Sequence, residues 1–376
     1  MAAKRSPLHG PFTVVGIGEL LWDIFPDGRR ELGGAVANLA YHASLLGDRG
    51  VLASRVGRDA GGDDLVARLR ALGVDGRYLQ RDADHPTGTV DVALHDGLPS
   101  YTIHEQVAFD YAQLDRGWRE LAARTDAVTF GTLAQRTPDA AQTIGAFVAA
   151  CPPHCVRLFD VNLRQRFWSA QVLDASLDAA TAVKLNDEEL PLVAGALGMS
   201  AGDEPAMLAA LLERYRLRVA CLTRGARGCL LVGAPAHGAR GCTPAHGAGA
   251  GVPGAANPAG RPAHRKPYRA LGGPEKPRKH LPVGVPGAAS DAGGPAHGIA
   301  SGAVRRTEQP GIHVPVADTV GAGDAFAAAL LYHVLRGGNL QRTAVAANRY
   351  AAFVATRRGA TPAVPEPVLH EARTAG

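Results

Sequence analysis

The stretch that most constrains the fold is Asp318–Phe326, where a Gly-Ala-Gly turn runs into an aspartate and then into an apolar segment. The pattern predicts a helix whose first backbone N–H groups have no partner within it. The turn residues Gly321, Ala322 and Gly323 let an anion contact these amides at the positive end of the helix dipole. Asp324 would then lie beside the anion, where a carboxylate can take a proton from a hydroxyl that attacks phosphorus. On the pattern alone, Asp324 is equally well explained as a helix cap.

A second glycine turn lies near the N-terminus. Gly33 and Gly34 precede a segment with helical spacing that stops at Gly47. Paired glycines let the backbone approach a ligand closely, and Asn38, one turn into the helix, offers both a donor and an acceptor. The alternative on pattern alone is a plain glycine turn followed by a polar helix face.

Together these stretches resemble the two signatures of the ribokinase-like (PfkB) family of sugar and nucleoside kinases. Asp-Thr-Val-Gly-Ala-Gly-Asp-Ala-Phe is similar to the C-terminal signature, and Gly-Gly followed by Asn and Leu-Gly is similar to the N-terminal one. They stand in the family's order, about 280 residues apart. The resemblance covers roughly residues 12–232 and 312–365 of a kinase domain over 12–365. It implies a three-layer α/β/α ribokinase-like fold with a mainly parallel central sheet and a small β lid.

The resemblance implies an enzyme that transfers the γ-phosphate of ATP to a sugar hydroxyl, with Asp324 as the base. It also implies that Asp23, Gly33, Gly34 and Asn38 hold the sugar. The runs Gly-Glu-Leu-Leu-Trp-Asp, Asn-Leu-Arg and Tyr-Thr-Ile-His look most like fructokinase-type members, so fructose is the favoured sugar. Ribose, 2-keto-3-deoxygluconate and a nucleoside are alternatives. A protein that binds sugar or nucleotide without turnover is a rival from another class, and the intact Asp324 counts against it.

Polar residues follow two of the predicted strands. Val156–Asp160 is typical of a strand and leads to Arg164, at the carboxyl end where open α/β sheets bind ligands. The resemblance implies that Arg164 faces the phosphates of the substrates; a surface arginine is the alternative. Asn186 and Glu189, three residues apart at a helix start, form a variant of the capping box. The family's Asn-x-x-Glu motif implies that they also hold Mg²⁺ and its waters, and this ion prefers oxygen ligands.

The rest of the nucleotide site is assigned by the resemblance. It implies that Thr223 and Gly225 line the nucleotide pocket, although their sequence is that of an ordinary hairpin. It places Asn348, on a helix predicted over Leu340–Arg357, at the adenine. Gly359-Ala360 resembles the family's closing Gly-Ala, which is tied to a monovalent cation such as K⁺.

Strand–helix pairs alternate along the chain, but residues 87–106 break this rhythm with the period-2 pattern of a hairpin. In the family such strands form the lid over the sugar and sometimes a dimer contact, so a homodimer through the lid is an expectation. Asp91 and His104 lie on these strands. They could contact the substrate, or face solvent with no specific role.

Several other classes are excluded by the sequence. The chain holds no G-x-x-x-x-G-K-[ST] motif, and Leu21 stands where a dinucleotide fingerprint beginning at Gly16 needs its third glycine. Cys151 and Cys155 are close enough for a metal clip, but no second ligand pair follows them. No secretory signal and no run of 18 apolar residues is present, so we expect a cytoplasmic protein without a membrane partner.

Residues 233–311 break the pattern of the rest of the chain. The segment from Gly233 to Ile312 holds 17 Gly and 12 Pro and repeats Pro-Ala-His-Gly three times. Such a composition buries too little apolar surface to fold, so we predict a disordered, low-complexity insertion. A corrupted reading frame is the alternative. The segment carries a net charge of +7 against +5 for the whole chain, so the rest is slightly acidic and a specific nucleic-acid partner is not expected.

Overall fold

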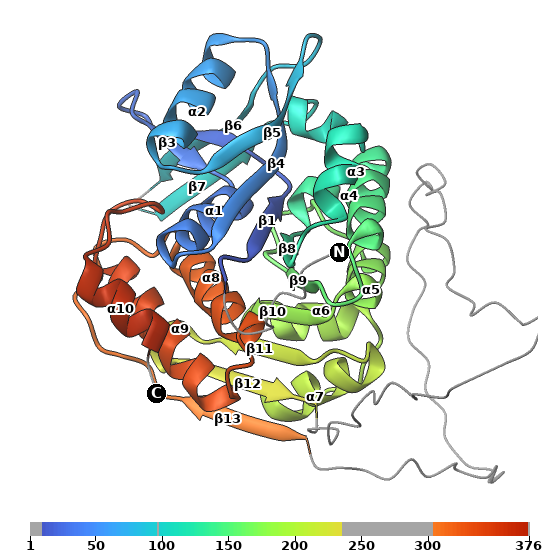
Figure 1. Ribbon diagram of the computed structural model, residues 1–376, viewed down its shortest axis with the longest axis vertical. Helices are drawn as coiled ribbons and strands as arrows, with labels where there is room; N and C mark the ends of the chain where they lie inside the picture. Colours follow the sequence, from blue (N-terminus) through green and yellow to red (C-terminus); the bar gives the residue numbers. More distant parts are fainter. Residues whose placement is uncertain (1–9, 96–97, 235–303, 375–376) are drawn as a thin grey trace, which may run out of the picture. The chain divides into compact units, whose positions relative to one another are not determined.

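The computed structural model describes residues 10–95, 98–234 and 304–374, which form an α/β structure around a nine-stranded sheet (Figure 1). The strand order is β13-β12-β11-β10-β9-β8-β1-β4-β5. All neighbours from β5 to β11 are parallel, whereas β12 and β13 pair antiparallel, so the mainly parallel sheet is confirmed. The strands are β1 (Thr13–Ile17), β4 (Arg49–Gly57), β5 (Asp75–Asp82), β8 (Ala127–Phe130), β9 (Val156–Asp160), β10 (Ala182–Asn186), β11 (Val219–Thr223), β12 (Cys229–Gly233) and β13 (Arg305–Gln309).

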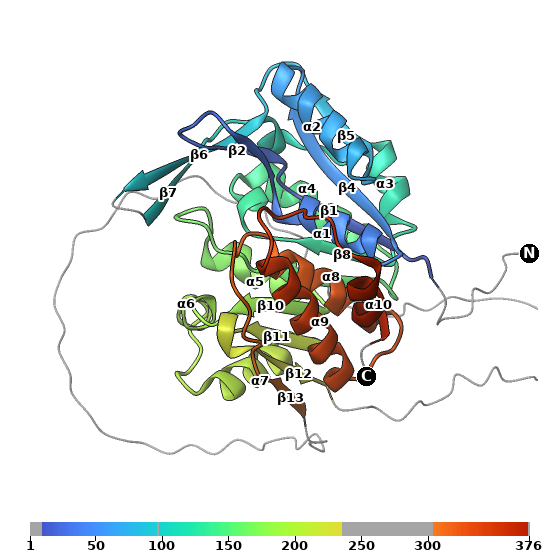
Figure 2. The ribbon, with the colours of Figure 1, turned by 90° about the vertical axis from the view of Figure 1, so that its left-hand side faces the viewer.

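Helices cover both faces of this sheet (Figures 1 and 2). Adjacent side chains of β1 enter different cores, because successive strand residues point to opposite faces. Val14 packs with Leu39 and Phe326 on one face, and Val15 packs with Phe147 on the other. The three-layer α/β/α fold is therefore confirmed. The first face carries α1 (Ala35–Leu45), α2 (Ala60–Ala71), α8 (Ala322–Leu335), α9 (Leu340–Ala355) and α10 (Glu366–Thr374); the second carries α3 (Arg116–Ala122), α4 (Pro138–Ala150), α5 (Ala170–Ala179), α6 (Glu189–Ala196) and α7 (Glu204–Arg214).

A second, four-stranded sheet forms the predicted lid, in the order β3-β2-β6-β7. The predicted hairpin is present as β6 (Gly88–His95) and β7 (Leu98–Ile103). The sequence did not indicate that β2 (Leu21–Ile24) and β3 (Arg30–Gly33) join it, because four-residue strands show too little periodicity. Side chains alternate along β2, so Asp23 points to one face of the lid and Trp22 to the other.

The predicted boundaries of the insertion need correction. Gly233 is the last residue of β12, and Arg305–Gln309 form β13, paired with β12 throughout. This edge strand was missed because its Arg-Arg-Thr-Glu-Gln sequence is polar on both faces, as suits an exposed edge. Residues 235–303, the rest of the predicted disordered segment, lie outside the described residues.

The strand order reverses direction beside β1. The chain first adds β4 and β5 on one side of β1, and later adds β8 to β11 on the other. In open α/β sheets, ligands bind outside the carboxyl ends of the strands at such a reversal. We therefore expect ligand-binding residues in the segments that follow β1, β8, β9 and β10.

Candidate active site

The two glycine turns picked out in the sequence meet at this edge of the sheet. Asn38 lies in the first turns of α1 and Asp324 in the first turn of α8, and the two helices pack side by side (Figure 1). The Asn38 Nδ2 donates a hydrogen bond of 2.8 Å to Asp324 Oδ2 across 286 residues of sequence. The predicted sugar side and the predicted phosphate side of the site are thus in direct contact.

The turn before α8 has the geometry of an anion site. Gly321 has a φ of +79°, and a Cβ there would lie 2.5 Å from the Ala360 Cα, so the turn requires glycine. The N–H groups of Gly323 and Asp324 donate to no oxygen of the described ranges. Ala322 differs from the prediction, because its N–H turns back to the Thr319 carbonyl at 3.3 Å and is less available to a ligand.

The carboxyl group of Asp324 has a raised pKa. Burial raises its pKa to about 6, and the charge of Asp160 acts in the same direction. The Asn38 hydrogen bond and the positive charges of Lys184 and Arg164 oppose this rise. A carboxylate with a pKa near 6 is ionised at neutral pH and holds a proton more readily than an exposed aspartate.

A buried ion pair lies beneath the α8 turn. The Lys184 Nζ is 2.8 and 3.0 Å from the two carboxylate oxygens of Asp160, and both residues are buried. Burial is the largest single effect and would lower the pKa of Lys184, but the charge and hydrogen bonds of Asp160 together with the charges of Glu189 and Asp324 outweigh it. The pKa is raised, so the ammonium stays charged. A Cβ on Gly323 would lie 3.4 Å from this ammonium. The Lys184 ammonium therefore places a positive charge next to the proposed phosphate turn, with Asp160 as its counter-ion.

Sequence reasoning gave no role to Asp160, Lys184 or Glu19. A signal was present for each: Lys184 interrupts the apolar run of β10, Asp160 ends β9, and Glu19 is the second residue after β1. Glu19 is 3% exposed, and burial raises its pKa to about 7. These three residues complete a row of charged groups along the carboxyl edge of the sheet.

The predicted sugar-binding residues lie around the same edge. Gly33 leaves room for the carboxylate of Asp23, since a Cβ there would lie 2.8 Å from Asp23 Oδ2. Gly34 caps α1 with a φ of +118°. Burial and the charge of Glu31 raise the pKa of Asp23 to about 6, and Arg164 lowers it. The exposed Arg164 also lowers the pKa of Glu19 and Asp324, so its charge reaches the whole site.

Asn186 and Glu189 form the predicted capping box. The Asn186 Oδ1 accepts from the Glu189 N–H at 2.8 Å, and Glu189 Oε2 accepts from the Asn186 N–H at 2.8 Å. Glu189 Oε1 accepts from the Leu163 N–H at 2.8 Å. Each carboxylate oxygen keeps a second lone pair, with which Glu189 can accept from a water of Mg²⁺. No group of three or more His, Cys, Asp or Glu in the described ranges is arranged to hold a metal by itself.

The predicted nucleotide residues are brought into one region. Thr223 ends β11 beside Asn186, which ends β10. The turn that begins at Gly225 packs on the loop after β13, because a Cβ on Gly311 would meet the Ala226 oxygen at 1.8 Å. Asn348 is buried on α9 and donates to the Pro310 carbonyl of that loop at 2.8 Å. Its amide nitrogen therefore positions the loop.

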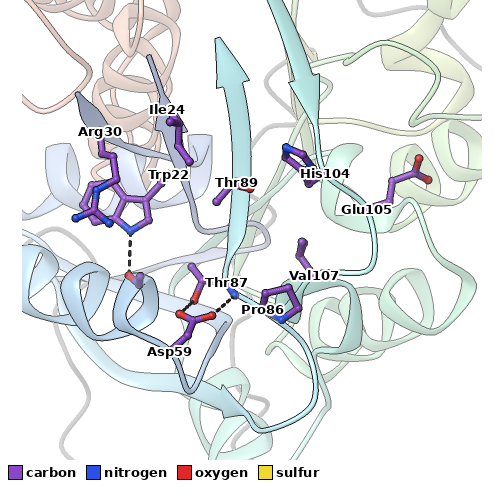
Figure 3. Close-up of a pocket in the computed structure, with 11 residues that line it drawn as sticks. Trp22, Ile24, Arg30, Asp59, Pro86, Thr87, Thr89, His104, Glu105 and Val107 are labelled. Atoms are coloured by element: carbon purple, nitrogen blue, oxygen red, sulfur yellow. Dashed lines mark hydrogen bonds between the residues drawn. The ribbon is translucent and has the colours of Figure 1, made fainter. Parts of the chain in front are cut away.

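The lid carries a pocket with a volume of about 380 Å³ on the face away from Asp23 (Figure 3). Trp22, Thr89 and His104 line it, and Trp22 points opposite to Asp23 along β2. Asp91 shares the face of its register partner Ile24, and its Oδ2 lies 2.8 Å from His104 Nε2. The side chains of Asp91 and His104 therefore pair with each other on the face of the lid opposite to Asp23. This position gives no support to the suggestion that either residue contacts the substrate.

The backbone groups at the predicted monovalent-cation site already have partners within the chain. The Ala360 carbonyl already accepts from the buried His42 at 3.0 Å, and the Gly359 N–H donates to Asp318 at 3.0 Å. A K⁺ site at Gly359-Ala360 stays a prediction. Cys151 and Cys155 are free and buried. No helix in the described part of the chain is long and apolar enough to cross a membrane.

Fold and site together define a class: a three-layer α/β/α protein that presents a helix N-terminus and a buried carboxylate at the switch point of its sheet. The family model described as pfkB family carbohydrate kinase matches residues 24–248 and 299–367. The chain belongs to this family.

Individual relatives agree with this assignment. A fructokinase of Salmonella typhimurium is 27% identical over 224 residues, which cover 57% of this chain and 71% of that protein. An uncharacterized sugar kinase of Pyrococcus horikoshii is 31% identical over 194 residues, covering 47% of this chain and 62% of that protein. The crystal structure of a fructokinase from Xylella fastidiosa with bound ATP superposes with a TM-score of 0.68 at 20% identity, covering 96% of this chain and 97% of that chain. At this identity the structural likeness shows the fold alone.

Proposed function

We propose that this protein transfers the γ-phosphate of ATP to a hydroxyl of a sugar. The observation that carries the proposal is the 2.8 Å contact between Asn38 and Asp324, which joins the two glycine turns in one site. A kinase of this kind needs a base beside the acceptor hydroxyl and donors around the phosphoryl group. Asp324 provides the base, and the free amides of Gly323 and Asp324 provide donors at the start of α8.

In the proposed reaction, the sugar hydroxyl oxygen forms a bond to the γ-phosphorus while the bond from that phosphorus to the β,γ-bridging oxygen breaks. ADP leaves with the electron pair of the broken bond, and Asp324 accepts the hydroxyl proton. The α8 amides and Lys184 face the charge on the phosphoryl oxygens and stabilise it. Arg164, which is exposed, attracts the anionic ATP. Mg²⁺ bound with ATP, near Asn186 and Glu189, would neutralise further phosphate charge.

Fructose is the proposed sugar. Fructokinases among the relatives and the Gly-Glu-Leu-Leu-Trp-Asp run support it. The test is release of ADP from ATP and Mg²⁺ in the presence of fructose, ribose, 2-keto-3-deoxygluconate and nucleosides. Turnover that is fastest with fructose is the expected result. Turnover with another member of the panel replaces fructose, and no turnover with any of them contradicts the kinase proposal and favours a binding protein.

The proposal extends to the nucleotide pocket, a monovalent cation, association of two copies and the cellular compartment. Thr223, Gly225 and Asn348 flank the adenine side, and a K⁺ ion near Gly359-Ala360 would tune the α8 turn. The outer face of the lid is the surface through which two copies would associate. We place the reaction in the cytoplasm, where ATP and free sugars are available.

The pH dependence follows from Asp324. Its pKa is raised to about 6, so below that pH the carboxyl is protonated and cannot take the hydroxyl proton. We expect kcat/KM to be constant above pH 8 and to fall by at least about tenfold per pH unit on the acid side, because Glu19 and Asp23, with pKa values of about 7 and about 6, gain protons in the same range. The measurement is kcat/KM for the sugar at saturating ATP between pH 5 and 8.5. A flat profile across that range would mean that no group with this pKa acts as the base.

A further inference from the structure

Glu19 occupies a position between the two turns of the site. It is the second residue after β1, at the reversal of strand order, and is 3% exposed. Its Oε1 accepts a hydrogen bond of 3.2 Å from the N–H of Ala35, the first residue of α1. The cap of α1 is Gly34, which has no side chain to serve this amide. One carboxylate oxygen of Glu19 therefore caps the N-terminus of α1 in place of the side chain that Gly34 lacks.

The second oxygen of Glu19 has no such partner. Glu19 Oε2 is buried and forms no hydrogen bond with any residue that the structure describes. The same holds for Asn38 Oδ1, on the next helical turn. A buried carboxylate oxygen left without a donor costs free energy, so its place in the fold calls for a donor from outside the chain. Glu19 lines a small pocket together with Asp160 and Asn162, between the ends of β1 and β9.

The chemistry of the pocket indicates a hydroxyl donor rather than a metal ion. No three metal-binding side chains converge among residues 10–95, 98–234 and 304–374. Asp160, the other carboxylate that lines this pocket, is already paired with Lys184. Glu19 also interacts electrostatically with Asp324 and Arg164, which places it within reach of the substrate rather than in a remote core. Glu19 Oε2 and Asn38 Oδ1 are two buried acceptors without a donor among the described residues, and a ligand with several hydroxyl groups can donate to such acceptors.

We propose that Glu19 is a specificity-determining residue whose Oε2 accepts a hydrogen bond from a second hydroxyl of the sugar, distinct from the one that is phosphorylated. This inference rests on the proposed function, since it concerns the same site. It assigns the substrate class as a polyhydroxylated sugar that keeps a free hydroxyl at that second position. A deoxy analogue at the position leaves Oε2 unpaired and is rejected, because a site built to bond a hydroxyl discriminates strongly against its absence.

The test compares the wild type with Glu19→Gln on the phosphorylated sugar and on its deoxy analogues. The Gln side chain can still accept from the Ala35 N–H, but it presents an NH₂ donor where Oε2 was an acceptor. We expect the sugar KM to rise about 10- to 100-fold, the size of a hydrogen bond to a charged group, with the ATP KM unchanged. The wild type should reject one deoxy analogue by a similar factor, and Glu19→Gln should lose that discrimination at the same position alone.

The outcomes separate this inference from the function beneath it. If the wild type turns over no sugar, the kinase proposal fails and this inference falls with it. If the wild type turns over sugar but Glu19→Gln keeps its sugar KM and its deoxy profile, only the role of Glu19 is overturned. A lowered unfolding temperature with both KM values unchanged would show a purely structural cap and would also overturn it. Should Glu19→Gln be insoluble, Glu19→Asp keeps the charge but withdraws the oxygen by one methylene, and a raised sugar KM alone is again expected.

Discussion

Asp324→Asn is expected to lower kcat by roughly 10²- to 10⁴-fold while ATP binding is retained, because an amide cannot accept the hydroxyl proton. The substitution is isosteric, and the new Oδ1 can still accept from Asn38 Nδ2, so the contact between the two turns survives. Steady-state kinetics on the best sugar and ATP titration by calorimetry measure the two quantities separately.

Glu120→Gln is the matched control for this variant. It also converts a carboxylate to an amide, but on the exposed surface of α3, where Arg116 is its only ion-pair partner among the residues that the structure describes. Its kcat should equal that of the wild type. Wild-type turnover in Asp324→Asn would remove Asp324 as the base, and loss of ATP binding would assign the residue to the nucleotide site instead.

Lys184→Met is expected to lower the free energy of unfolding by about 3–5 kcal/mol, because it leaves the buried Asp160 carboxylate without its partner. Methionine keeps most of the length of the lysine stem, so the change is mainly one of charge. Urea unfolding followed by circular dichroism measures the loss. The same variant should move the acid limb of the pH profile upward, since Lys184 lowers the pKa of Asp324 and Asp160 raises it.

A double variant tells loss of the ion pair from loss of packing. In Asp160→Asn with Lys184→Met no charge stays buried, so it should be more stable than Lys184→Met alone. If the single variant unfolds at the wild-type urea concentration, the pair has no structural weight. If the double variant is no more stable than the single one, the cost comes from packing and not from an unpaired carboxylate.

The parts of the site that were predictable are those with local signals. The turn at Gly321 and the turn at Gly34 adopt positive φ angles, and only glycine fits them, so both stand out in the sequence. The Asn186–Glu189 box was predictable for the same reason, since a helix start reuses the same residue types at fixed spacing. The β-α alternation, the lid hairpin and most helices follow from hydrophobic period alone.

The parts that were missed depend on strand pairing. Lys184 meets Asp160 because β10 and β9 pair in parallel with these two residues in register. Nothing in the local sequence of either strand shows that register. Asp91 lies on the face of the lid opposite to Asp23 because it pairs in register with Ile24, and the local sequence does not show this pairing either. Glu19 needed the fold as well, because its partner is the start of a helix beyond two further strands.

The pairing of β12 with β13 has a consequence for how the chain can vary. Thr223, at the carboxyl edge of β11, pairs with Cys229 at the start of β12, whereas Gly233 pairs with Val219 and Arg305 at the opposite edge. Ala234 and Val304 therefore flank the intervening segment on the rim remote from Asp324. The entropy of closing a loop rises only with the logarithm of its length, so sequence of almost any length can be spliced between these points. A tag or reporter domain fused at this rim is therefore expected to leave the site on the opposite rim undisturbed.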